Sequence, residues 1–64
     1  MKINGSNTPR AEGKTILDYL ESSGYVPLRV AVEVNNTIIS RDDFDKYIIS
    51  DNDEIEIVAF MGGG

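Results

Sequence analysis

Cysteine, histidine and tryptophan are all missing from the 64 residues of this sequence. Without cysteine no disulfide can stabilise the fold, which is typical of proteins kept in a reducing compartment. The lack of cysteine and histidine also excludes a Cys/His pair, a Ser-His-Asp triad and the ordinary zinc sites. We therefore expect a protein that is not itself an enzyme and that holds no permanently bound cofactor or metal.

Positive charge is also scarce. Six Lys and Arg residues stand against eleven Asp and Glu residues, which gives a formal net charge of −5. A surface of this sign repels phosphate backbones, so nucleic acid is not an expected partner. No stretch approaches the roughly 20 apolar residues of a membrane span, and the first residues lack the apolar region of a signal peptide. These absences predict a cytoplasmic protein that does not bind a membrane.

Two acidic clusters, Asp42-Asp43 and residues 51–54, resemble parts of a calcium site. The second lacks the central glycine and the terminal glutamate of an EF-hand loop. Because turns favour Asp and Asn in any case, neither cluster predicts a metal site.

The first quarter of the chain predicts two strands. Residues 1–4 alternate between apolar and polar side chains, and residues 5–7 have the composition of a turn. Residues 8–11 would then return as a second strand. That strand should lie at a sheet edge, because Pro9 has no amide hydrogen to donate.

A helix is expected over residues 16–23. Thr15 can accept a hydrogen bond at its N-terminus, and the side chain of Asp18 can reach back three residues, as in a capping box. Apolar residues follow on one face at helical spacing, and Gly24 suits the left-handed conformation that ends many helices.

The second half of the chain predicts three strands and a short helix. Residues 30–35 form the plainest strand, Asn35-Asn36 suits a tight hairpin, and residues 37–39 would return. Ser40 could then cap a short helix that begins at Arg41.

Apolar spacing assigns the faces of these later elements. Phe44 and Ile48 are four residues apart and should share one face of the short helix. In a last strand over residues 54–60, Ile55, Ile57 and Ala59 should face the core.

This order of elements predicts an α+β protein of the β-grasp, or ubiquitin-like, class. One main helix would cross one face of a mixed sheet, with a short second helix, and the first and last strands would run parallel at the centre. An SH3-like barrel suits the sequence less well, because the helix is marked by a cap, an apolar stripe and a stop. We expect a β-grasp domain at residues 1–60 and a flexible glycine tail at residues 61–64.

The tail Met61-Gly62-Gly63-Gly64 carries the one group that we expect to react, the α-carboxylate of Gly64. Glycine lets another chain approach the backbone closely, and four extended residues reach roughly 13 Å. Met61, Gly62 and Gly63 could therefore thread a narrow site on a partner. A carboxylate becomes reactive once ATP adenylates it, and the ATP-binding parts would belong to that partner. The alternative is a frayed terminus.

Val58 and Phe60 would face away from the core, beside this tail. Exposed apolar groups next to a reactive segment indicate a docking surface. Alternatively, Phe60 could fold over the sheet edge or pack on Tyr25.

Five segments together carry a resemblance to a known family: residues 1–5, 30–35, 39–44, 51–57 and 60–64. On these segments the whole chain resembles the ThiS family, the sulfur carriers of thiamin biosynthesis in bacteria. Ser40 departs from the pattern, because the family commonly has proline there, and this affects a turn rather than the tail.

The resemblance implies a reaction cycle. An adenylating enzyme related to ubiquitin-activating enzymes would use Mg-ATP to convert the Gly64 carboxylate to an acyl-adenylate. A sulfur relay fed by a cysteine desulfurase would make a thiocarboxylate, and thiazole synthase would take the sulfur for thiazole formation. Two alternatives stay open: a carrier of the molybdopterin synthase small-subunit type, and a β-grasp interaction module without covalent chemistry.

Overall fold

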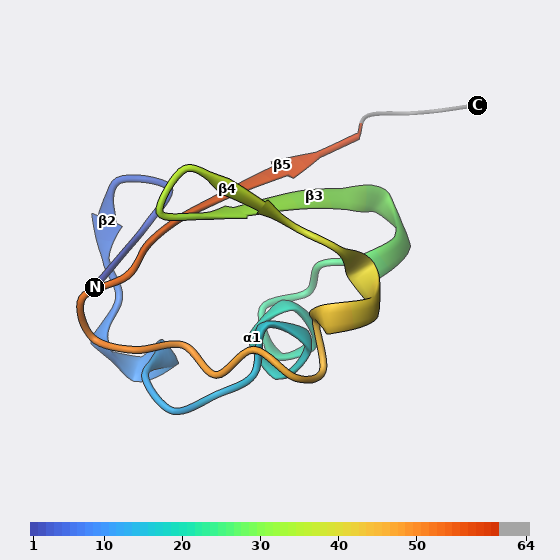
Figure 1. Ribbon diagram of the computed structural model, residues 1–64. Coiled ribbons are helices and arrows are strands. Elements are labelled where there is room, and N and C mark those ends of the chain that lie inside the picture. The colour runs from blue at the N-terminus through green and yellow to red at the C-terminus, as the bar shows by residue number, and fades with distance from the viewer. Residues whose placement is uncertain (61–64) are drawn as a thin grey trace.

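The computed structural model describes residues 1–60, in which five strands form one mixed sheet with the order β2-β1-β5-β3-β4. The helix α1 crosses one face of this sheet (Figure 1). The bounds are β1 Lys2–Ile3, β2 Ser6–Asn7, α1 Ile16–Ser22, β3 Val30–Val34, β4 Thr37–Ile39 and β5 Glu54–Ala59, with 3₁₀ turns η1 Pro9–Ala11, η2 Pro27–Arg29 and η3 Arg41–Asp43.

The centre of the sheet joins the two ends of the described chain. β1 pairs with β5 in parallel, with Ile3 opposite Ile55, and β5 pairs with β3 in antiparallel orientation. Both hairpins are antiparallel and lie at the outer edges. This is the predicted β-grasp arrangement, in which one helix covers a mixed sheet.

The core lies between the sheet and α1. The strands supply their inward-facing residues, as the alternation of valines in β3 predicts, and α1 supplies one apolar stripe. The buried apolar residues are Ile3, Ala11, Ile16, Tyr19, Leu20, Val30, Val32, Val34, Phe44, Ile49, Ile55 and Ile57.

Residues with positive φ close both hairpins. The turn between β3 and β4 holds Asn35 and Asn36 at φ angles of 52° and 70°, and Asn4 and Gly5 take 51° and 83° between β1 and β2. Two successive residues in this region give a turn whose twist matches that of the strands. The Asn35-Asn36 hairpin predicted from the sequence is confirmed.

The predicted helix is confirmed, with its end at Ser22 rather than at residue 23. The Thr15 hydroxyl accepts a hydrogen bond from the Asp18 amide at 3.0 Å, which caps the N-terminus. Gly24 has a φ of +85°, the left-handed conformation expected at the stop.

The expected strand at residues 8–11 is wrong. The hairpin already turns at Asn4 and Gly5, so the returning strand β2 pairs through Ser6 and Asn7. The chain then enters η1, where Pro9 takes the first position, because its fixed φ suits a helical start.

The short second helix is also shorter than expected. Ser40 does cap it, accepting from the Asp42 amide at 3.3 Å, but the helix is only the 3₁₀ turn η3. Phe44 and Ile48 do not share a face, since Phe44 is buried and Ile48 is 61 % exposed. After η3 the chain becomes extended and pairs with residues 13–15. Because side chains alternate between the two sides of an extended segment, Ile49 rather than Ile48 faces the core.

A buried carboxylate fixes the start of β5. Asp53, only 5 % exposed, accepts hydrogen bonds from the Asn35 side chain, the Tyr47 hydroxyl and the Ser50 amide, each at 2.9 Å. The side-chain oxygen of Asn35 in turn accepts from the Glu54 amide at 2.9 Å. This network ties the β3–β4 turn to the strand that leads to the tail.

The same network sets the protonation of its members. Burial raises the pKa of the Asp53 carboxyl, but hydrogen bonds from Ser50, Asn35 and Tyr47 outweigh it, so this pKa lies below its ordinary value. Burial, with the bond to Asp53, raises the pKa of Tyr47. A carboxyl pKa lowered by folding stabilises the protein above the unfolded pKa of about 3.9, and that contribution is lost as the pH falls through the folded value.

We predict that Asp53→Asn lowers the free energy of unfolding by about 2 kcal/mol at pH 7, because buried donors lose a charged acceptor. The loss should shrink as the pH falls below about 4, where the wild-type carboxyl itself becomes protonated. Urea unfolding of both proteins between pH 2.5 and 7 measures this difference. A difference that stays constant over that range would show that Asp53 does not contribute as a carboxylate.

Candidate functional site

The candidate site is the end of β5, where the described chain stops at Phe60. The predicted reactive residue Gly64 and the threading residues Met61, Gly62 and Gly63 lie outside the described residues. Their roles, and the division of the chain at residue 60, stay predictions. The structure instead shows how the strand that leads to them is held and what surrounds its last residues.

Hydrogen bonds hold β5 beyond the end of β1. β1 pairs with β5 only as far as Ile55, but the Asn4 side chain then accepts from the Ile57 amide at 2.7 Å. On the other edge β3 pairs with β5 as far as Ala59. The Phe60 amide donates to the Arg29 carbonyl at 2.8 Å, so hydrogen bonding continues one residue past the strand.

An apolar surface, here called the exit patch, lies on the outer face of the sheet beside this end of β5. It consists of Ala31, Ile38, Val58 and Phe60. Val58 and Phe60 are 57 % and 54 % exposed, as strand alternation predicts, and Ile38 is 72 % exposed. Phe60 is thus half exposed. Its docking role, and the alternative that it folds over the sheet edge or packs on Tyr25, stay predictions.

Sequence reasoning missed Ile38, although the predicted hairpin contained the signal. A two-residue turn at Asn35-Asn36 pairs Ile39 with Val32, which is buried, so the preceding residue of β4 faces outward. Beside the patch opens a hollow of about 430 Å³. Its lining residues are Val30, Ala31, Ile38, Ile39, Ser40, Arg41, Phe44 and Phe60.

Ala59 is exposed, although it lies on the core side of the sheet as predicted. It pairs with Val30 at the last register position of β5. The buried part of β5 ends at Ile57, so Ala59 already lies beyond the core.

Behind the patch the outer face is charged, with three glutamates and with Lys2 of β1 paired with Glu54. Glu33 and Glu56 stand directly opposite each other on β3 and β5, and Glu54 lies on the same face of β5. Like charges directly opposite in a sheet are destabilising. The outer face is thus divided into an apolar part near the strand end and a charged part farther back.

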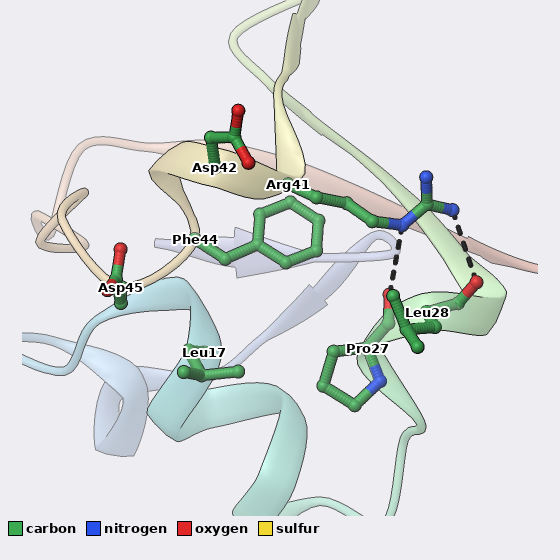
Figure 2. Close-up of a pocket in the computed structure, with 7 residues that line it drawn as sticks. All are labelled: Leu17, Pro27, Leu28, Arg41, Asp42, Phe44 and Asp45. Atoms are coloured by element: carbon green, nitrogen blue, oxygen red, sulfur yellow. Dashed lines mark hydrogen bonds between the residues drawn. The ribbon is translucent and has the colours of Figure 1, made fainter.

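A second hollow, of about 320 Å³, lies between α1 and η3 on the other side of Arg41 (Figure 2). The hollow is lined by Leu17, Pro27, Leu28, Arg41, Asp42, Phe44 and Asp45.

Within residues 1–60 no group of three or more metal-ligating side chains gathers in this hollow or elsewhere. No helix among these residues is long and apolar enough to cross a membrane.

Comparison with known families decides where the chain belongs. The model of the ThiS family matches it over residues 1–64, which is its whole length. The chain belongs to the ThiS family. The resemblance to ThiS-type sulfur carriers that the sequence indicated is thereby confirmed.

Individual ThiS relatives agree in sequence and fold. The sulfur carrier protein ThiS of Bacillus subtilis is 35 % identical over 65 residues, which span 100 % of this chain and 98 % of that protein. The crystal structure of the thiamine biosynthesis protein ThiS from Geobacter metallireducens matches with a TM-score of 0.77 at 30 % identity. That match covers 98 % of this chain and 96 % of the other.

A longer protein also matches. The thiazole synthase of Magnetococcus marinus is 36 % identical over 62 residues, which are 97 % of this chain but 19 % of that protein. The chain therefore spans about a fifth of the length of the thiazole synthase that it resembles. A second thiazole synthase, from Paramagnetospirillum magneticum, matches to the same extent.

The assignment of faces in β5 can be tested by paired substitutions. We predict that Val58→Thr changes the free energy of unfolding by no more than about 0.5 kcal/mol, because the side chain lies at the surface. Ile57→Thr should cost roughly 2–4 kcal/mol, because it leaves a cavity and buries a hydroxyl. Denaturant unfolding compares the two, and equal losses would contradict the register described for β5.

Proposed function

We propose that this chain is a sulfur carrier of thiamin biosynthesis, and that the α-carboxylate of Gly64 carries the sulfur. The observation that carries the proposal is the match of the ThiS family model over the whole chain, residues 1–64. The absence of cysteine and histidine supports it, because the chain then depends on its partners for nucleophilic and acid–base chemistry. The protein is a co-substrate of other enzymes in this proposal, and it acts in the cytoplasm.

The proposed chemistry takes place at one carbonyl carbon. A carboxylate oxygen of Gly64 attacks the α-phosphorus of Mg-ATP on an adenylating enzyme related to ubiquitin-activating enzymes, and pyrophosphate leaves. The terminal sulfur of a persulfide supplied through a cysteine desulfurase attacks the carbonyl carbon and displaces AMP, which leaves an acyl disulfide. A thiol of a partner protein then attacks the donor's sulfur, so that the S–S bond breaks, the thiocarboxylate leaves and a disulfide forms on the donor. Gly63 and Gly62 place no side chain beside this carbon, so the active site of the partner can close around the backbone.

Thiazole synthase is the proposed acceptor of the sulfur. Support comes from the two thiazole synthases that match this chain over about a fifth of their own length. In each of them a segment related to this chain belongs to the same polypeptide as the thiazole synthase. Membership in the ThiS family also favours thiazole formation over delivery of sulfur to a pterin precursor. No observation favours the molybdopterin route.

The exit patch is the proposed docking surface for the adenylating enzyme and thiazole synthase. Val58 and Phe60 place apolar area beside the residues that react, which is where a partner must bind to receive the tail. The acidic Glu33, Glu54 and Glu56 lie behind the patch and suit a partner with basic groups. Such charges chiefly accelerate association and fix orientation.

Removal of Gly64 tests the carrier proposal. We predict that wild-type protein incubated with the adenylating enzyme, Mg-ATP and a sulfur donor gains the mass of one sulfur in place of one oxygen in its C-terminal peptide. A chain that ends at Gly63 should stay unmodified and should unfold at the same urea concentration as wild type. Intact-mass analysis and peptide mapping measure the first result. Modification of the shortened chain at the wild-type rate would contradict the proposed role of Gly64. No modification of wild type would favour a non-covalent interaction module.

Docking is tested by Phe60→Ala. We predict that KM of the adenylation reaction for this carrier rises about tenfold while kcat changes little, because binding area is lost and the reacting group is retained. Ile48→Ala is the matched control, since Ile48 is similarly exposed but lies beside Thr15 rather than on the outer face of the sheet. Pyrophosphate release measures both variants. An equal rise in KM for both would show that the exit patch is not the docking surface.

A further inference from the structure

Arg41 forms hydrogen bonds to three backbone carbonyls of a distant segment. Its Nε donates to the Pro27 carbonyl at 3.3 Å, and its Nη2 donates to the carbonyls of Leu28 and Val30 at 3.3 and 3.2 Å. Figure 2 shows the side chain extended across this segment, with two of the bonds drawn. The guanidinium therefore joins η3 to η2 and to the first residue of β3.

An arginine suits this position for geometric reasons. η2 is one short turn without a side-chain cap, and the last carbonyls of a helical turn lack partners within it. The guanidinium presents several N–H donors in a rigid plane, so one side chain can serve several carbonyls. Phe44, buried three residues after Arg41, anchors η3 in the core and thereby fixes the backbone that carries the guanidinium.

The same segment holds the end of β5 from its other side. Arg29 lies between Leu28 and Val30, and its carbonyl accepts from the Phe60 amide at 2.8 Å. Residues 27–30 thus contact Arg41 through three carbonyls and Phe60 through the remaining one. Arg41 is thus linked to Phe60, the last residue before the tail, through the backbone of residues 28–30 and the hydrogen bonds on its two sides.

We propose that Arg41 is a positioning residue, which fixes residues 27–30 so that the Arg29 carbonyl holds Phe60 at the start of the tail. This inference rests on the proposed function, because the position of Phe60 matters for activity only if a partner enzyme receives the tail that follows it. An adenylating enzyme must receive the Gly64 carboxylate in line with the α-phosphorus of ATP. A small misplacement of a reacting group lowers the rate steeply, so the backbone from which the tail departs has to be held.

Amide hydrogen exchange tests the positioning directly. In Arg41→Met, which keeps an apolar stem but no donor, we expect the Phe60 amide to exchange roughly tenfold faster relative to the Asn4 amide than in wild type. The Asn4 amide donates to the Ile55 carbonyl at 2.8 Å near the other end of β5 and reports general loss of stability. An unchanged ratio of the two rates overturns the proposal.

Two further variants separate hydrogen bonding from charge and from folding. Arg41→Lys keeps the charge and one donor group, so it should restore part of the protection at Phe60. Arg10→Met removes the same charge from a side chain that lies over the Tyr19 ring, and it should leave the exchange ratio unchanged. An equal change in Arg10→Met would overturn the proposal. If Arg41→Met does not fold, the ratio measured in Arg41→Lys decides, and a wild-type value there overturns the proposal as well.

Kinetics then links the position of Phe60 to activation. Arg41→Met should lower kcat of adenylation roughly tenfold with little change in KM, because the exit patch is retained while the tail is presented less accurately. That pattern is the reverse of the one expected for Phe60→Ala. An unchanged kcat beside a changed exchange ratio would overturn the link to activation. If wild type itself is not adenylated, the proposed function fails, while the exchange ratio still decides whether Arg41 positions Phe60.

Discussion

The insertion of β5 between β1 and β3 is the constraint on which the rest of the structure depends. It joins the two ends of the described chain in one sheet, and it turns Ile55 and Ile57 into the core that α1 covers. Polar groups then fix β5 at successive points: the Asp53 network at its start, the Asn4 side chain near its middle and the Arg29 carbonyl just past its end. The strand that delivers the proposed reactive end is therefore held along its whole length.

This arrangement separates stability from chemistry. The core lies on the side of the sheet that α1 covers. Val58 and Phe60 lie on the opposite, outer face, where a partner can contact them. In the proposed function, other proteins supply the catalysis. In our account the fold contributes position: it presents one carboxylate beside an apolar patch, with acidic groups behind the patch.

Local signals in the sequence predicted much of this fold. The valine alternation of β3, the Asn35-Asn36 hairpin and the Thr15 cap depend on neighbouring residues only, and each was found as expected. The errors arose where tertiary context competes with local pattern. Pro9 began a 3₁₀ turn because the hairpin had closed earlier, and residues 44–48 left helical spacing because the chain pairs with residues 13–15.

The site was harder to predict than the fold. Exposure of Val58 and Phe60 follows from strand alternation. The hydrogen bonds that fix β5 and the segment beside its end, however, join residues far apart in sequence, such as Asn35 with Asp53 and Arg41 with Pro27. The most direct test of the carrier function supplies thiazole synthase with this protein as a thiocarboxylate labelled with heavy sulfur, without another sulfur source. Our account predicts that the label enters the thiazole product, one sulfur for each carrier consumed. Consumption of the other substrates with no label in the product would contradict it.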